Sequence, residues 1–287
     1  MTVRTKIIII IFLLLLMLGG LFLVAYPILS EKYYEVHHSE IVVDYEQEMQ
    51  KKDNAELLAA LEAANAYNEA LFKGEIQAIE FEQNGYFDLL DLSGNGIMGY
   101  VEIPCIAVKL PIYHGVSDSV LQKGAGHLPP TSLPVGGINT HATISAHSGM
   151  ASQKMFTELE LMKIGDIFCV HILGESLYYQ VEYINNRVEP NDVTELQIQR
   201  GRDLVTLLTC TPVGVNTHRL VVRGERIEKP EEEITATAPI TQEPKESVFY
   251  TMYMDGLILS LKLAIIPLIL TIIAMVVIIR RRKQKTA

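Results

Sequence analysis

The chain has 287 residues, of which 49% are hydrophobic and 20% are charged. Its 34 acidic residues outnumber its 24 basic residues, which gives a formal net charge of −10 at pH 7. Nucleic acids attract basic proteins through their phosphates, so this balance argues against nucleic acid as a partner.

The chain begins with a long apolar run. Residues 7–29 carry no charge and are long enough to cross a hydrocarbon core of about 30 Å as a helix. The run exceeds the apolar core of a signal peptide, and no cleavage site with small residues follows it. We therefore expect residues 1–29 to form a short cytoplasmic tip and an uncleaved anchor in the lipid bilayer.

Residues 30–96 are expected to form an extracytoplasmic helical segment with a possible lid region. Residues 46–72 are rich in Ala, Leu, Glu and Lys and contain no Gly or Pro, so they predict one long or two shorter amphipathic helices that end at Gly74. Residues 91–102 (DLSGNGIMGYVE) match several positions of a calcium-binding EF-hand loop. The residues after Met98 are typical of a strand, however, and an EF-hand needs a helix there, which argues against calcium binding.

Residues 97–228 are dominated by short runs that alternate apolar and polar residues or are rich in Val, Ile and Tyr. The runs are YVEIPCIAVKLPIYHG, ATISAHSG, IFCVHI, LYYQVEYINNRV, LVTLLTC and HRLVVRGERI, and turn residues link them. One short helix is expected near residues 153–162. Many strands with few helices predict a mostly β fold, a closed and largely antiparallel barrel.

The C-terminal part is predicted to be a stalk followed by a second membrane span. Residues 229–256 are acidic and rich in Thr and Pro, which is typical of a solvated linker. Residues 257–287 contain an apolar run whose only charge is Lys262, and the basic sequence RRRK follows it. We expect a transmembrane helix with a basic cytoplasmic tail.

Positive residues flank both apolar runs on the side away from the middle of the chain. Arg4 and Lys6 precede the first run, and residues 280–283 (RRRK) follow the second. Because Lys and Arg stay preferentially in the cytoplasm, we expect a two-pass protein with both termini inside and the middle outside.

The chain has three cysteines, and an odd number outside the cytoplasm is not a disulfide framework. Cys105 and Cys169 lie inside apolar, strand-like runs and are expected to be buried packing residues. Cys210 ends the run LVTLLTC, and Arg219 stands nine residues later, after a turn that contains Pro and Gly. A guanidinium that faces a sulfur favours the thiolate and can stabilise an oxyanion. A structural cysteine with an unrelated arginine is equally compatible with this pattern.

A cysteine nucleophile also needs a histidine, and the chain has eight. His147 in ATISAHSGM ends an apolar run among small residues, which would place its imidazole at a strand end beside a cleft. His141 lies at the other end of the same run. The histidines in turn-like settings are expected to be structural, namely His114, His127 and His218.

These features together resemble the sortase family. TLLTC followed by Arg219 is similar to the TLxTC…R signature of sortases. The segments GYVEIPCIAVKLPIYHG, LQKGAGHLPPTSLPVGG and FTELELMKIGD, with the His-Ser-Gly turn between the last two, resemble class C, the pilin-polymerising sortases. The resemblance covers residues 97–227. It implies an eight-stranded sortase-type β-barrel, here with an N-terminal helical segment and two flanking transmembrane helices, and implies that His147, Cys210 and Arg219 are catalytic.

Two features depart from the family pattern. The family's histidine usually stands in a GHRG-like turn, whereas this chain has AHSG with Ser148 in place of Arg. Many class C members carry an Asp-Pro-aromatic lid motif, which residues 73–96 lack. A lid built on Tyr86, Phe87 and Asp88 would be held weakly, because no proline fixes its turn.

The resemblance implies a membrane-anchored cysteine transpeptidase that needs no metal or organic cofactor. Its partners would be pilin or surface proteins with an LPxTG-like sorting signal, which it would cleave between Thr and Gly before joining the acyl group to a Lys amine of a pilin subunit. One alternative is a sortase that anchors proteins to the cell wall through a peptidoglycan amine. Another, from a different class, is a non-catalytic, membrane-tethered binding module.

Overall fold

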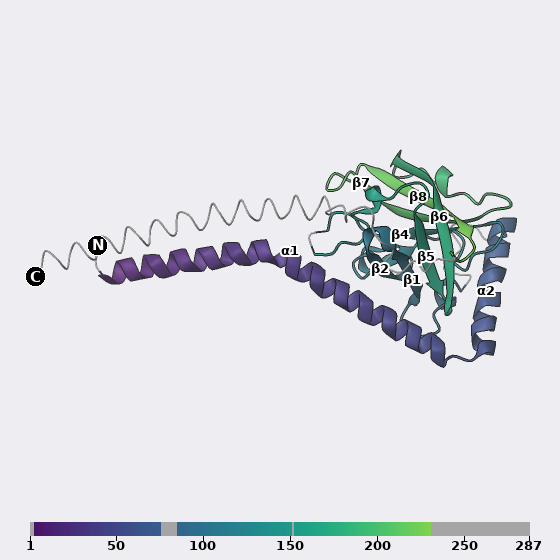
Figure 1. Cartoon of the computed structure of the whole chain (residues 1–287), viewed down its shortest axis with the longest axis horizontal. Helices are drawn as coiled ribbons and strands as arrows, with labels where there is room; N and C mark the ends of the chain where they lie inside the picture. The colour runs from purple at the N-terminus through teal and green to yellow at the C-terminus, as the bar shows by residue number, and fades with distance from the viewer. Residues whose placement is uncertain (1–2, 76–84, 151, 231–287) are drawn as a thin grey trace, which may run out of the picture. The chain divides into compact units, whose positions relative to one another are not determined.

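The computed structural model describes residues 3–75, 85–150 and 152–230. The chain starts with the long helix α1 (Val3–Lys51) (Figure 1). Residues 3–29 belong to a different compact unit from the body that begins at Ser30. Among the described residues, only the beginning of α1 is apolar and long enough to cross a membrane. The predicted second span, residues 257–287, and nearly all of the stalk lie outside the described residues.

The prediction of helices over residues 46–72 is confirmed, with a break after Lys51. Helix α2 (Asn54–Lys73) begins where the Asp53 side chain accepts a hydrogen bond from the Glu56 N–H at 2.7 Å. It ends at Gly74, whose φ of 74° is the left-handed conformation that glycine adopts without strain. The Asn68 side chain of α2 exchanges two hydrogen bonds with the backbone of Leu133, at 3.0 and 2.6 Å, which fixes α2 to the body.

In the described residues, eight strands form a closed barrel in the order β1-β2-β3-β4-β7-β8-β6-β5 (Figure 1). Only the β2–β3 and β4–β7 pairings are parallel, so the predicted mostly antiparallel barrel is confirmed. The strands are β1 (Ile97–Ile103), β2 (Val108–His114), β3 (Ala125–His127), β4 (Thr140–Ser145), β5 (Ile167–Ile172), β6 (Glu175–Val188), β7 (Asp203–Thr211) and β8 (His218–Ile227). The short helices are η2 (Tyr86–Asp88), η3 (Pro104–Ile106), α3 (Asp118–Leu121), η4 (Leu159–Leu161) and η5 (Thr194–Leu196).

The alternation of side chains along the strands determines which residues point away from the barrel core. Val205 and Leu207 of β7 belong to the buried hydrophobic cluster, as do Leu220 and Val222 of β8. Because successive side chains of a strand point to opposite faces, the residues between and beyond them point to the outer face. This outer face of β7 and β8 therefore carries Cys210.

The expected burial of Cys105 is wrong, whereas that of Cys169 is confirmed. The run YVEIPCIAVKLPIYHG is not one strand: Pro104 opens η3, and Ala107 closes it with a φ of 47°. Cys105 sits in this turn and is exposed, because a turn between two strands does not point consistently into the core. Cys169 lies within β5 and is buried.

The short helix expected near residues 153–162 is also wrong, apart from the single turn of η4. Met155 has a φ of 46°, which interrupts any helix at that position. Met155, Phe156 and Leu159 are all buried. Burial of these three side chains from an irregular backbone overrides the local helix propensity.

The strand expected after Met98 is confirmed, because β1 occupies the place where an EF-hand would need its second helix. Tyr86 in η2 is fully buried, and its hydroxyl lies 2.9 Å from His127 Nδ1 and accepts a hydrogen bond from the Gly115 N–H at 3.0 Å. Tyr86 is thus a core residue that fixes η2 to β2 and β3. How firmly a lid would be held over the cleft stays a prediction.

Candidate active site

The backbone brings the candidate histidine and cysteine to neighbouring strand ends. Strands β4 and β7 run parallel, with Ser145 opposite Leu208. Beyond this pair, the Ala146 N–H donates to the Leu208 carbonyl at 3.2 Å, and the Thr209 hydroxyl donates to the Ala146 carbonyl at 2.7 Å. His147 follows Ala146 and Cys210 follows Thr209, so the two residues lie next to each other in backbone position, at the same edge of the barrel.

The candidate arginine faces the cysteine across an antiparallel pair. Cys210 lies directly opposite Arg219 in the β7–β8 register. Side chains of directly opposed residues share a face, with Cβ atoms about 4.5–5.5 Å apart. Arg219 Nη1 donates to the carbonyls of His218 at 3.1 Å and Asn216 at 3.3 Å, which holds the guanidinium at the β7–β8 turn. Cys210 and Arg219 are both half-buried, so a substrate can reach them.

The turn after His147 packs on the loop after Cys210. Gly149 has a φ of +74°, and a Cβ built on it would lie 2.8 Å from Val213 Cγ1. The Gly149 N–H donates to the Thr157 hydroxyl at 3.0 Å, and the His147 carbonyl accepts from the Phe156 N–H at 3.0 Å. The turn is therefore fixed from both sides. The sequence does not reveal that Val213 and Thr157 contact the turn after His147. Only the glycine at position 149 indicates that another segment can pack closely against this turn.

The environments of other candidates exclude them as acid or nucleophile at neutral pH. His127 and His141 are fully buried, and burial lowers the pKa of each to about 4, so both are neutral. Burial raises the pKa of the Cys169 thiol to about 12, which disfavours its thiolate. His114 packs with its ring nitrogens toward the carbonyls of Leu89 and Gly96 and is structural, as expected.

No group of three or more His, Cys, Asp or Glu side chains that could hold a metal ion occurs in the part of the chain that the structure describes. The arrangement at the strand ends suits covalent chemistry. It combines the half-buried Cys210 thiol, a histidine that follows β4, and the Arg219 guanidinium held at the β7–β8 turn, all at one edge of the barrel.

Comparison with known proteins identifies the barrel. A model of the sortase domain matches residues 101–227. The curated sortase A of Streptococcus agalactiae is 31% identical over 148 residues, which are 50% of this chain and 58% of that protein. The chain thus spans less than two thirds of the length of this curated relative.

Solved structures match over nearly their whole length. Sortase C of Streptococcus pneumoniae is 43% identical with a TM-score of 0.60, and the match covers 66% of this chain and 97% of that one. Sortase C of Clostridium perfringens, also 43% identical with a TM-score of 0.60, is matched over 67% of this chain and 100% of its own. The strand order, the paired Cys210 and Arg219 and these matches agree: the chain belongs to the sortase family of cysteine transpeptidases, and the two solved structures above are sortases of class C.

Proposed function

We propose that this protein is a membrane-anchored transpeptidase that cleaves an LPxTG-like sorting signal between Thr and Gly and joins the acyl group to a Lys amine of a pilin subunit. The observation that carries the proposal is the direct pairing of Cys210 with Arg219, at the edge of the barrel where His147 follows the end of β4. The similar pneumococcal structure is described in terms of pilin substrate specificity, and the clostridial one contains a C-terminal cell wall sorting motif.

The first half of the proposed reaction forms a thioester. The Cys210 thiolate attacks the carbonyl carbon of the signal's Thr, and the carbonyl oxygen gains the negative charge. Arg219 stabilises this charge with N–H groups other than those that hold it at the turn. The C–N bond to Gly then breaks as protonated His147 gives its proton to the departing amine.

The second half transfers the acyl group. A neutral Lys amine attacks the thioester carbon and loses its proton to His147, and the C–S bond breaks. This step restores the Cys210 thiolate and the protonated His147, and it leaves an isopeptide bond between the two proteins. A peptidoglycan amine would use the same residues, so analysis of the product separates pilus polymerisation from cell-wall anchoring.

The test is turnover of a sorting-signal peptide by the full chain in detergent. Cys210→Ala should abolish both cleavage and transfer, because it removes the sulfur that forms the proposed thioester. Cys105→Ala is the matched control, since Cys105 is an exposed cysteine outside the proposed site, and it should retain activity. Appreciable turnover by Cys210→Ala would refute the assignment, and so would a loss caused equally by Cys105→Ala.

We further propose the two-pass topology, with both termini cytoplasmic, on the basis of the positive residues outside each apolar run. A membrane-impermeant thiol reagent should label a cysteine at Thr237 in intact cells but not one at Thr286. The parent for both variants needs Cys105→Ala and Cys210→Ala, because these two thiols are not buried. Equal labelling of both positions would contradict the topology.

A further inference from the structure

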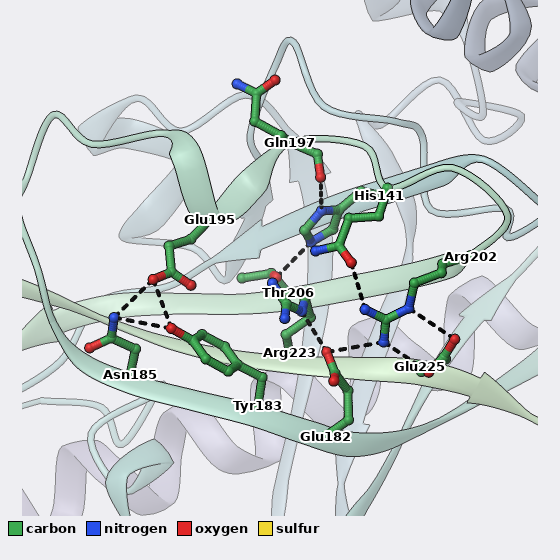
Figure 2. Close-up of polar contacts among 11 residues, drawn as sticks. His141, Glu182, Tyr183, Asn185, Glu195, Gln197, Arg202, Thr206, Arg223 and Glu225 are labelled. Carbon is green, nitrogen blue, oxygen red and sulfur yellow. Dashed lines mark hydrogen bonds and ion pairs between the residues drawn. The ribbon is translucent and has the colours of Figure 1, made fainter.

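A polar network on the outer face of the barrel fastens one segment to four strands (Figure 2). The segment is the β6–β7 connection, residues 189–202, which contains η5. Its members in the network are Glu195, Gln197 and Arg202. The strands β4, β6, β7 and β8 supply the partners drawn in Figure 2.

His141 provides the tie to β4 and β7. The imidazole is fully buried, with Nδ1 2.8 Å from the Gln197 carbonyl oxygen and Nε2 2.8 Å from the Thr206 hydroxyl. A carbonyl only accepts, so Nδ1 carries the proton and donates it to Gln197. Because the ring is neutral, Nε2 is then an acceptor and receives a hydrogen bond from the Thr206 hydroxyl. The two bonds select one tautomer and one ring orientation.

The other ties reach β6 and β8. The Glu195 carboxylate accepts hydrogen bonds from the Tyr183 hydroxyl at 2.8 Å and from Asn185 Nδ2 at 2.9 Å. Arg202 binds both carboxylate oxygens of Glu225, at 3.1 and 2.8 Å. The Glu195 bonds hold the middle of the segment to β6, and the Arg202 bonds hold its C-terminal end to β8. Among the hydrogen bonds of the described residues, those of His141 join Gln197 to β4 and β7.

The segment lies on the same face as the proposed nucleophile. Thr206 and Cys210 are four residues apart on β7, so both point to the outer face, and Arg223 and Arg219 have the same relation on β8. Four strand residues span about 13 Å. An extended peptide whose scissile residue sits at Cys210 and whose upstream part runs toward Thr206 would meet the segment within about four residues.

We propose that His141 is a positioning residue for substrate. By joining Gln197 to Thr206, it sets the distance between the β6–β7 segment and strand β7, and so the room for the peptide residues upstream of the scissile Thr. The proposal rests on the proposed transpeptidase function. Loosening this tie lets the segment move away from β7, which weakens binding of the peptide and leaves the chemistry at Cys210 in place.

Two substitutions separate the two bonds of His141. An Asn amide nitrogen is attached to Cγ, as Nδ1 is, so His141→Asn can keep the bond to Gln197 while losing Thr206. A Gln amide reaches the position of Nε2, so His141→Gln can keep the bond to Thr206 while losing Gln197. The proposal expects His141→Gln to raise the KM for the peptide about tenfold with little change in kcat, since a lost hydrogen bond costs about 1 kcal/mol or somewhat more. His141→Asn should raise KM clearly less.

Limited trypsin digestion of the full chain supplies a readout that is independent of activity. Arg200 is an exposed residue of the segment, so cleavage there reports how often the segment opens. His141→Gln should accelerate this cleavage more than His141→Asn. His127→Gln is the control, because His127 is also fully buried but bonds to Tyr86 and Ser132 instead. It should lower the melting temperature without changing KM or cleavage at Arg200.

Equal effects of His141→Gln and His141→Asn on KM and cleavage would overturn the proposal and reduce His141 to a packing residue. A normal KM in His141→Gln would also overturn it. If the wild-type chain turned over no sorting-signal peptide, the proposed function itself would fail. If the wild-type chain turned over the peptide and His141→Gln left the KM unchanged, only the inference about His141 would be refuted.

Discussion

Gly149 is the residue at which one added methyl group would disturb the proposed site. Its φ of +74° strains any other side chain, and its Cβ position lies 2.8 Å from Val213 Cγ1 in the loop that follows Cys210. A side chain here must push the His147 turn away from the cysteine loop. The spacing of imidazole and sulfur thus depends on a position that has no side chain.

We predict that Gly149→Ala lowers kcat by more than tenfold, because a misplacement of about 1 Å between reacting groups can cost that much or more. Adding Val213→Ala should recover part of the loss, since it removes the methyl group that the new Cβ meets. Gly174→Ala is the matched control for backbone strain, because Gly174 has a φ of +81° but no heavy atom near its Cβ position. It should lower stability by about 1 kcal/mol and leave kcat unchanged. An equal loss of kcat in Gly174→Ala would show that strain alone is responsible.

The sequence contains enough information to predict the pairing of Cys210 with Arg219, because a turn rich in Pro, Gly and Asn between two β-rich runs folds the second run back on the first. It does not contain the contact between Gly149 and Val213, which depends on how two loops meet in space. The exposure of Cys105 is not predictable for a related reason, since the run around Pro104 has the composition of a strand, whereas Pro104 opens η3.

At the level of elements, the buried hydroxyl of Tyr86 joins η2 to the barrel through His127 and Gly115. We predict that Tyr86→Phe destabilises the protein by about 1–3 kcal/mol, because it leaves His127 Nδ1 and the Gly115 N–H without their partner. Tyr67→Phe is the matched control, since the Tyr67 hydroxyl is buried with no hydrogen-bond partner among the described residues. It should be nearly neutral or slightly stabilising. Urea unfolding of the full chain in detergent measures the free energy of unfolding of both variants. Equal decreases in the two variants would contradict the role of the Tyr86 hydroxyl.

The long elements were predictable and the short ones were not. Strands such as β6 and β8 carry many β-branched and aromatic residues, and the helices over residues 46–72 have clear caps. Strand β3 has only three residues, AGH, and it exists because β2 and β4 pair with it on both sides. No local pattern can reveal such a strand, since its neighbours in space supply its hydrogen bonds.

For the molecule as a whole, two buried histidines should make stability fall in mild acid. Burial lowers the pKa values of His127 and His141 from 6.5 to about 4. The unfolded chain therefore binds these protons at a higher pH than the folded chain does, so stability is full above about pH 6.5 and is lost as the pH falls toward 4. Each residue contributes at most about 3 kcal/mol to this loss at pH 4.

The measurement is the melting temperature of the full chain in detergent between pH 7 and pH 4. Wild-type protein should lose stability steeply over this range. A variant with both His127→Gln and His141→Gln should have a lower melting temperature at pH 7, and its melting temperature should fall clearly less between pH 7 and pH 4. An unchanged slope in the double variant would mean that other groups control the acid sensitivity.

Intact mass spectrometry followed by peptide mapping can detect the proposed thioester between Cys210 and the Thr of a sorting signal. The full chain is incubated with an LPxTG-like peptide in the absence of an acceptor amine, quenched in acid and digested. We expect an adduct with the mass of the peptide up to its Thr, located on the fragment that contains Cys210 and released by hydroxylamine. An adduct on Cys105 or Cys169, or peptide cleavage that proceeds with no adduct on Cys210 at any time point, would contradict this expectation.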